Sequence, residues 1–524
     1  MKTRWKLLIA LAVFLAVFTG IWLVTMHVQP ENEVEAYKKS LLEKGERLEI
    51  SEVLPPPVPP ESNGVAVVQS AFALFSPLSN EWTNLPPMIR MVAPGKAMVG
   101  WAQPYVRGYD FTNSWENVMA AAAADRPATE MLRQAMDYPA VDFQPDYSEG
   151  AEMVLSHLAP LKRSVQRLSA AAMCDLHNGD TASATTNLCA LLALVQGTHD
   201  ERTLISQLVR MAMGSIAASV NWELLQSTNL TDAELATLQK CWARLEYLKA
   251  GENSFLMERA SVEATIKKMR ASNAEVKRVL GGYGPGGSPP TGGGSGSGNW
   301  LVDFGDFARD GWDKTRMAGA AFLWQTSWSY SDELHALQGD QIILEAMRTV
   351  GTNQFFNPAY TNMVNQLYTL GVTNAPDDWW LKLDIPDFRQ IFSGDIGALS
   401  AAVRKIMAAE TSRRIVITAI ALKRFQLKHG NFPEKLSELT PEFLASVSLD
   451  PVDVQPLRYR LNADGTFTLY SIGLNGKDDG GDPSLGKGVR SSFFYWQNPQ
   501  ALDSVWPEPA TAEEIQNFYE HPPE

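Results

Sequence analysis

Apolar and small residues dominate the middle of the chain in a pattern typical of packed helices. The longest such region covers residues 155–280. Within it, the residues Asn-Gly-Asp at 178–180 predict a turn between helices over 168–177 and 181–196, with Asp180 as the N-cap of the second helix. Thr231 and Ser272 each precede a glutamate by three residues, which is the capping-box pattern of a helix start. This region therefore predicts a helical bundle.

Two further regions carry a helical pattern. Residues 300–350 are helical and aromatic, and Trp324 and Trp328 lie four positions apart, on one helix face. Residues 399–429 predict a long helix that ends at His429, because Gly430 favours a helix C-terminus and Pro433 prevents continuation. We interpret His429 as a helix-end cation rather than a ligand.

The pattern changes to a period of two near the C-terminal end. Leu457, Tyr459 and Leu461 alternate with arginines, and the run 466–472 alternates in the same way. Such alternation predicts strands with two different faces, and the intervening Asp464-Gly465 is a strong hairpin turn. An antiparallel hairpin is therefore expected here.

The N-terminal pattern is different again, because an uncharged apolar run begins at Leu7 and ends at Met26. Its length of about 20 residues predicts a transmembrane helix. Basic residues precede it and acidic residues follow it, so we expect a single-pass signal anchor in the cell inner membrane, with a cytoplasmic N-terminus and an extracytoplasmic bulk. The alternative is a cleaved signal peptide, but the run is long and lacks a small-residue cleavage site.

These elements give a mainly α fold: an N-terminal transmembrane helix, a helical bundle and a small C-terminal α+β module with the hairpin. The turn at 178–180, with Ala171, Gly179 and Ala184, is similar to a tetratricopeptide hairpin, but no second copy follows at about 34 residues. We divide the chain into seven parts: an anchor (1–30), a stalk with a Pro-rich spacer (31–64), a helical domain (65–280), a Gly-rich flexible linker (281–298), an aromatic helical segment (299–398), the α+β module (399–490) and a C-terminal tail (491–524).

Composition and charge exclude several partners. The net charge of -14 argues against nucleic acid, because phosphate neutralisation needs clustered basic residues. The Gly-rich run at 281–298 lacks the Gly-Lys-Ser/Thr ending of a phosphate-binding loop, so we expect no nucleotide.

The three cysteines, Cys174, Cys189 and Cys241, are interpreted as small buried hydrophobes. The alternative is a disulfide between Cys174 and Cys189.

An acidic, Gly-rich loop follows the predicted hairpin, with the sequence Asn-Gly-Lys-Asp-Asp-Gly-Gly-Asp at 475–482. Its carboxylates are Asp478, Asp479 and Asp482. Closely spaced carboxylates repel one another, so a cation is one way to hold them together. The alternative is a solvated turn closed by hydrogen bonds from the Asp side chains.

This part of the chain, from Ile417 to Pro483, resembles the globular domain of type II secretion major pseudopilins and related type IV pilin-like proteins. The residues that carry the resemblance are Ala421 to Phe425, His429 to Pro433, Leu436 to Leu439, Pro441 to Leu444, Asp450-Pro451, the hairpin and the loop from Gly473 to Gly481. The resemblance implies that the loop binds calcium through Asp478, Asp479 and Asp482, with Asp450 or Asp453 nearby. The processed Gly-Phe-Thr-Leu-Ile-Glu start of pilin-like proteins is absent, so we do not expect a filament subunit.

No motif names a reaction. The seven histidines are scattered, and a group of Asp332, Glu333 and His335 is a weak acid/base candidate because adjacent helix residues point in different directions. We therefore expect a membrane-anchored extracytoplasmic scaffold or interaction protein of the bacterial envelope, in a secretion or pilus-like assembly, with other envelope proteins as partners. The alternative is an envelope glycan-binding protein or hydrolase, whose aromatic residues (Trp324, Trp328, Trp379 and Trp380) would stack on sugars.

Overall fold

The computed structural model describes residues 13–15, 17–18, 20–21, 24–75, 89–107, 112–282, 319, 321–351, 356–371, 392, 396–485 and 501–521. In these ranges the chain is mainly helical, with small sheets. The helices are α2 (Gln29–Glu43), α3 (Ile50–Val53), α4 (Val65–Leu74), α6 (Trp115–Ala124), α7 (Arg126–Arg133), α8 (Leu158–His177), α9 (Thr181–Gly197), α10 (Leu204–Leu225), α11 (Asp232–Ala243), α12 (Leu248–Ala271), α13 (Asn273–Gly282), α15 (Ser329–Gly351), α16 (Phe356–Thr369), α17 (Ile396–His429) and α18 (Ala512–Glu520).

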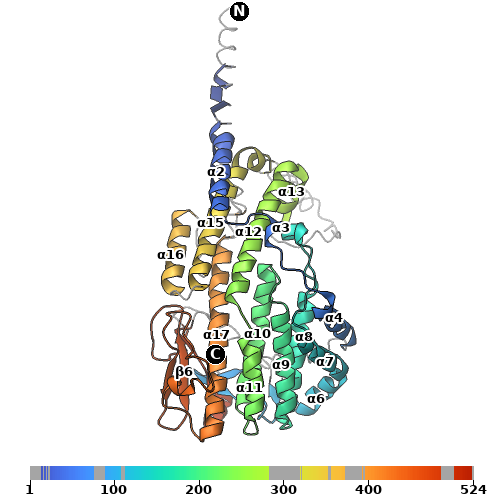
Figure 1. Ribbon diagram of the computed structural model, residues 1–524, viewed down its shortest axis with the longest axis vertical. Coiled ribbons are helices and arrows are strands. Elements are labelled where there is room, and N and C mark those ends of the chain that lie inside the picture. The colour runs from blue at the N-terminus through green and yellow to red at the C-terminus, as the bar shows by residue number, and fades with distance from the viewer. Residues whose placement is uncertain are drawn as a thin grey trace, which may run out of the picture.

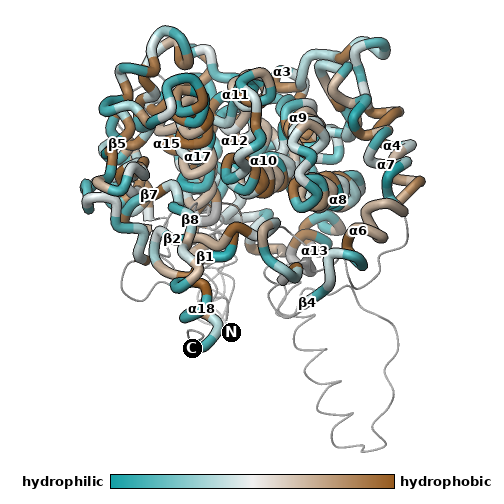
Figure 2. The backbone as a smooth tube through the Cα atoms, turned by 90° about the horizontal axis from the view of Figure 1, so that it is seen from below, coloured by the Kyte–Doolittle hydropathy of each residue, from teal (hydrophilic) through white to brown (hydrophobic). Residues whose placement is uncertain are grey.

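The long helices run side by side along the long axis of the molecule (Figure 1). Seen end-on, α8, α10 and α17 form a row, with the C-terminal strands at one end and α4 and α7 at the other (Figure 2). α10 contacts α8, α9, α12 and α17, so it is the central helix. Its buried residues surround it on all sides and include Trp222, which is fully buried. A helix that is apolar all round is typical of a core position.

α8 and α9 form the expected helical hairpin. Gly179 in the connecting turn has a φ of +78°, a conformation that costs glycine little because it has no Cβ. The Asp180 side chain then accepts a hydrogen bond from Ser183 N at 2.9 Å and caps α9. Thr231 and Glu234 form a complete capping box at the start of α11. Local sequence therefore determines where these helices begin.

The strands of the described residues form three small sheets. β5 (Arg458–Leu461) and β6 (Phe467–Ile472) are the predicted antiparallel hairpin, and β7 (Asp503–Val505) pairs with the other edge of β6. β1 (Arg90–Ala93), β2 (Lys96–Met98) and β8 (Glu508–Pro509) form the second sheet, and β3 (Val106–Arg107) and β4 (Thr112–Asn113) form the third. Thus part of the segment predicted as a C-terminal tail contributes strands to two sheets.

The hydrophobic core is continuous between the helical bundle and the C-terminal sheet. A single cluster of buried residues includes Leu168 of α8, Trp222 of α10, Ile420 of α17, Leu469 of β6 and Trp506 beyond β7. α17 passes from α12 and α15 at one end to β6 at the other. The sheet is therefore mounted on the bundle by shared apolar packing.

The predicted transmembrane helix is not supported. Within the described residues, no helix is both long and apolar enough to cross a membrane. From Val24 onward the described helix continues into α2, which carries the charges of Glu31, Glu33 and Lys38. Much of the run that begins at Leu7 lies outside the described residues.

Two other sequence predictions fall partly or wholly outside the described residues. Of the Gly-rich segment 281–298, only residues 281 and 282 are described, at the end of α13. Trp379 and Trp380 lie outside the described ranges. Both predictions therefore stay as predictions.

Candidate functional site

The acidic loop begins at Gly473, directly after β6, and is described as far as Leu485. Gly476, Gly480 and Gly481 have φ values of +75°, +77° and +84°, which residues other than glycine rarely adopt. A Cβ on Gly476 would also lie 2.1 Å from the side chain of Asn357 on α16. The glycines are thus required by the path of the loop and by its contact with α16.

The loop is wrapped around the buried carboxylate of Asp503, the first residue of β7. Asp503 accepts hydrogen bonds from four backbone N–H groups: Gly481 at 2.8 Å, Asp482 at 3.1 Å, Gly473 at 3.3 Å and Asp479 at 3.5 Å. Burial raises the pKa of Asp503, and these N–H groups act in the opposite direction. Asp503 is therefore the residue that holds the two ends of the loop together.

Asp478 is the first of the three predicted calcium ligands. Its Oδ1 accepts hydrogen bonds from Tyr470 Oη at 3.0 Å and from Gly480 N at 3.0 Å. Its Oδ2 lies 3.5 Å from Arg458 Nε. Asp478 has a pKa below its usual value because these donors and the guanidinium favour the charged form over the opposing effect of burial.

The other two predicted ligands have separate partners. Asp479 accepts a hydrogen bond from Asn475 Nδ2 at 2.7 Å, and Asp482 accepts one from Ser484 N at 2.9 Å. The three carboxylates therefore each have their own hydrogen-bond partners. Among the described residues, no group of three or more His, Cys, Asp or Glu side chains is placed to bind a metal ion. Calcium at this loop stays a prediction.

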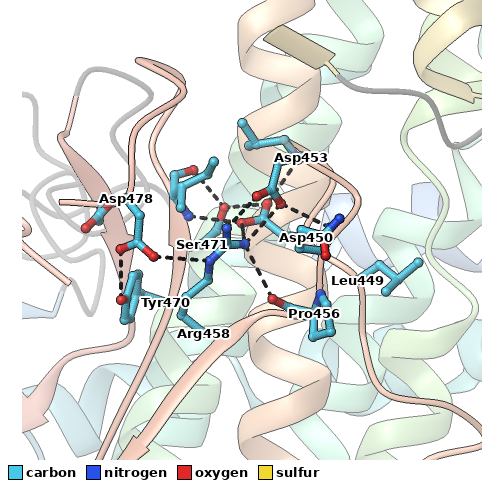
Figure 3. A network of polar contacts seen from close by, with 12 residues as sticks. Leu449, Asp450, Asp453, Pro456, Arg458, Tyr470, Ser471 and Asp478 are labelled. Carbon is cyan, nitrogen blue, oxygen red and sulfur yellow. Dashed lines mark hydrogen bonds and ion pairs between the residues drawn. The ribbon is translucent and has the colours of Figure 1, made fainter. Parts of the chain in front are cut away.

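Asp450 and Asp453, which sequence placed near the loop, form a network with Arg458 (Figure 3). Asp450 is fully buried and accepts hydrogen bonds from Ser471 Oγ at 2.7 Å and Ile472 N at 3.0 Å. Arg458 donates to Asp450 at 3.2 Å and to both oxygens of Asp453. Burial raises the pKa of Asp450 to about 6, although these hydrogen bonds favour its charged form.

Arg458 therefore joins three carboxylates, those of Asp450, Asp453 and Asp478. The ion pairs hold the segment before β5, the sheet and the acidic loop in one arrangement. One guanidinium neutralises only part of this negative charge. Chemically, the site consists of bonded carboxylates, which suits a structural role better than proton transfer.

The sequence analysis did not identify Asp503, because it lies 21 to 30 positions along the chain from the backbone N–H groups that it binds. The signal available was the sequence Asp-Ser-Val at 503–505, a short run with strand-type alternation. Three residues are too few to distinguish a strand from a loop. The pairing of β6 with β7 depends on tertiary structure that this pattern does not encode.

The residues of the weak acid/base candidate, Asp332, Glu333 and His335, each contact a different partner. Asp332 accepts a hydrogen bond from Trp324 Nε1 at 3.0 Å, and His335 Nδ1 lies 2.7 Å from Ser331 O. Glu333 is instead paired with Lys38. Trp324 is fully buried, so its ring offers no face to a sugar, and Trp328 packs against the same small core.

Glu333 belongs to a group that we call the Lys38 cluster, made of Lys38, Glu263, Arg270 and Glu333, in which the two glutamates are buried and the two cations are partly exposed. Lys38 Nζ, on α2, lies 2.7 Å from Glu263 Oε2 on α12 and also contacts Glu333 Oε1 on α15. Arg270 contacts the other oxygen of Glu333. Burial and the charge of Glu333 raise the pKa of Glu263 to about 7.

A second group, the Glu46 cluster, lies just beyond α2 and consists of Glu46, Arg259, Gln341 and Arg348, all of them buried except Arg348, which is 35% exposed. Glu46 is 2.8 Å from Arg259 Nη2 on α12 and 2.5 Å from Arg348 Nη1 on α15. Gln341 Nε2 donates to Glu46 at 3.0 Å. Burial opposes ionisation, but the hydrogen bonds of Arg348 and Arg259 prevail and lower the pKa of Glu46 to about 2.

Comparison with known proteins does not assign the chain to a family. No family model matches the chain, and neither a curated protein nor a solved structure matches it. The pseudopilin resemblance therefore stays a prediction carried by the residues of the hairpin and the loop.

Proposed function

We propose that this protein is a scaffold or interaction protein of the bacterial envelope rather than an enzyme. The observation that carries the proposal is the Lys38 cluster. Its ion pairs connect α2 to α12 and α15. The two glutamates are almost fully buried, since Glu333 is 0% exposed and Glu263 is 3% exposed, and Lys38 is 14% exposed. These charged groups hold helices together instead of facing a substrate.

Buried ion pairs of this kind contribute little net stability compared with apolar packing, but breaking one leaves an uncompensated charge. The arrangement of α2 is therefore strongly determined. The Glu46 cluster repeats the connection to α12 and α15 one turn beyond the end of α2. A fixed orientation of one helix on a large body is what a scaffold requires.

The role in a secretion or pilus-like assembly rests on the resemblance of the C-terminal module, and the location in the envelope rests on sequence alone. In this proposal the exposed residues of the module contact a partner protein. Asp479 in the acidic loop and Asp464 at the hairpin turn are both exposed and lie on that module. Either position is suitable for a probe.

Site-specific photocrosslinking in intact cells tests the proposal. A photoreactive residue replaces Asp479 or Asp464, and a matched control replaces Glu130, which is exposed on α7 on the opposite side of the body (Figure 1). We expect a discrete protein adduct from the module and none from Glu130. The same adduct from all three positions, or none from the module, would overturn the proposal.

The alternative of a glycan-binding protein or hydrolase makes a different prediction for the same material. The purified chain would be retained on peptidoglycan or envelope polysaccharide. Retention without a protein adduct would favour that alternative over a scaffold.

A further inference from the structure

Two of the three cysteines meet in the helical bundle. Cys189 on α9 and Cys241 on α11 are separated by 52 positions in sequence, and their sulfur atoms are 3.2 Å apart. Both are free thiols in the structure, as is Cys174. Sequence reasoning considered only Cys174 as a partner for Cys189, because those two fall on the arms of one helical hairpin.

The two helices that carry this contact run in the same direction. Thr181 Oγ1, at the start of α9, donates to Glu234 Oε1, in the first turn of α11, at 3.1 Å. Cys189 lies eight residues after Thr181, and Cys241 lies seven residues after Glu234. At a rise of about 1.5 Å per residue, both steps cover about 10–12 Å. The hydrogen bond and the sulfur contact are therefore two points of attachment between parallel helices.

The remaining distance to a covalent bond is small. A disulfide has a sulfur–sulfur distance of about 2.0 Å, so the sulfur atoms must approach by about 1 Å. The helices already pack against each other. A change of this size is within reach of side-chain rotation and a small helix shift.

The two thiols differ in reactivity. Cys189 is 5% exposed, whereas Cys241 is partly exposed. The hydrogen bond with Cys189 lowers the pKa of Cys241, and Arg244 acts in the same direction against burial. The hydrogen bond with Cys241 and burial raise the pKa of Cys189. Cys241 is thus the thiol that reacts first with an external oxidant, because the thiolate is the nucleophile.

We propose that Cys189 and Cys241 are a modification site that forms a reversible disulfide with a disulfide compound as oxidant. The Cys241 thiolate attacks one sulfur of the oxidant, and the other sulfur leaves as a thiolate. Cys189 loses its proton to that thiolate and attacks Cys241 Sγ. The second half of the oxidant then leaves as a thiolate and takes up from solvent the proton that Cys241 released when its own thiolate formed. Two protein thiols are oxidised to one disulfide, and one disulfide compound is reduced to two thiols.

A disulfide between Cys189 and Cys241 would affect the attachment of α17 and the C-terminal module to the helical bundle. α11 also contacts α17, where Arg424 donates to Asp232 at 2.7 Å, and Gln239 Nε2 donates to Phe443 O at 2.8 Å. A covalent bond to α9 would fix α11 on the bundle and would close a loop that contains the central helix α10. A cross-link over a loop of this length restricts the unfolded chain.

Peptide mapping of the full chain tests this inference. The folded protein is incubated with oxidised glutathione, its remaining thiols are alkylated, and the digest is analysed by mass spectrometry. We expect one disulfide-linked pair of peptides containing Cys189 and Cys241, with Cys174 alkylated after unfolding. Three alkylated thiols, a Cys174–Cys189 link, or a stable glutathione adduct on Cys241 would each overturn the proposal.

A thermal measurement adds a second readout. Oxidation is expected to raise the melting temperature by on the order of 5–10 °C, and a thiol reductant should reverse the rise. The rise should persist in Cys174→Ser and disappear in Cys241→Ser. Because the peptide map uses the unmodified sequence, the proposal stays testable even if one variant fails to fold.

Discussion

The Glu223 carboxylate on α10 accepts the backbone N–H of Gly100 through both oxygens, at 3.0 and 2.9 Å. Glu223 is 1% exposed, and burial raises its pKa to about 8, although the N–H groups of Gly100 and Trp101 act in the opposite direction. A Cβ on Gly100 would lie 2.9 Å from Glu223 Oε1, so this close approach requires glycine. The segment after β2 is thus attached to the central helix by one buried acid.

The burial of Glu223 predicts a loss of stability with rising pH. The folded state keeps the proton on Glu223 up to about pH 8, whereas the unfolded state releases it near its ordinary value of 4.5. Stability from this group is therefore fully present below about pH 4.5 and is lost as pH rises to 8. The loss is on the order of 3–5 kcal/mol.

Glu223→Gln is the variant that isolates this effect. The amide keeps an acceptor for Gly100 N but does not ionise, so the variant should lose less stability than the wild type between pH 5 and pH 8. Chemical denaturation at several pH values measures the difference. Parallel pH profiles for the two proteins would contradict the prediction.

Asp503 should be much more sensitive to substitution than an exposed carboxylate of the C-terminal module. Asp503→Asn replaces one acceptor oxygen with a donor that faces the N–H groups of the loop, and we expect a loss of about 2–4 kcal/mol in the free energy of unfolding. Asp479→Asn is the matched control, because Asp479 is exposed and should change stability by less than about 0.5 kcal/mol. Equal effects of the two variants in denaturant titrations would rule out the assigned role of Asp503.

The Lys38 cluster predicts a large difference between two lysine variants. Lys38→Ala leaves Glu263 and Glu333 with less compensation inside the protein, at an expected cost of about 3–5 kcal/mol. Lys267→Ala removes an exposed pair with Glu49, whose side chains are 53% and 59% exposed, and should cost less than about 1 kcal/mol. Limited proteolysis near α2 and thermal unfolding report the effect, and comparable losses would refute it.

The calcium prediction has its own test. If Asp478, Asp479 and Asp482 bind calcium, millimolar calcium should raise the melting temperature of the full chain, and a chelator should reverse the rise. The double variant Asp479→Asn, Asp482→Asn should abolish the response without loss of the fold. A melting temperature that is independent of calcium would remove the assignment.

Local features of the fold could be predicted because their causes are local. The caps at Asp180 and Thr231 depend on side chains within three residues of the helix start. The hairpin of β5 and β6 follows from alternation around Asp464-Gly465. These features need no knowledge of the remaining chain.

The features that hold the molecule together could not be predicted in the same way. The Lys38–Glu333 contact joins residues 295 positions apart, and the sequence analysis placed Glu333 with its neighbours Asp332 and His335 instead of with Lys38. The sulfur contact of Cys241 likewise depends on how α9 and α11 pack. Such pairs are determined by tertiary packing. An uncharged apolar run such as the one from Leu7 to Met26 likewise does not indicate which residues pack against it.

The segment from Asp503 to Pro509 has a mechanical consequence. Trp506 N donates to Leu469 O of β6 at 2.9 Å, Trp222 Nε1 of α10 donates to Pro507 O at 2.8 Å, and Glu508 N donates to Gly95 O at 2.9 Å. Successive residues thus hold the C-terminal sheet, the central helix and the sheet of β2. A pulling force applied to the C-terminal sheet would load these bonds together, and tension would pass directly into α10 instead of unravelling the module.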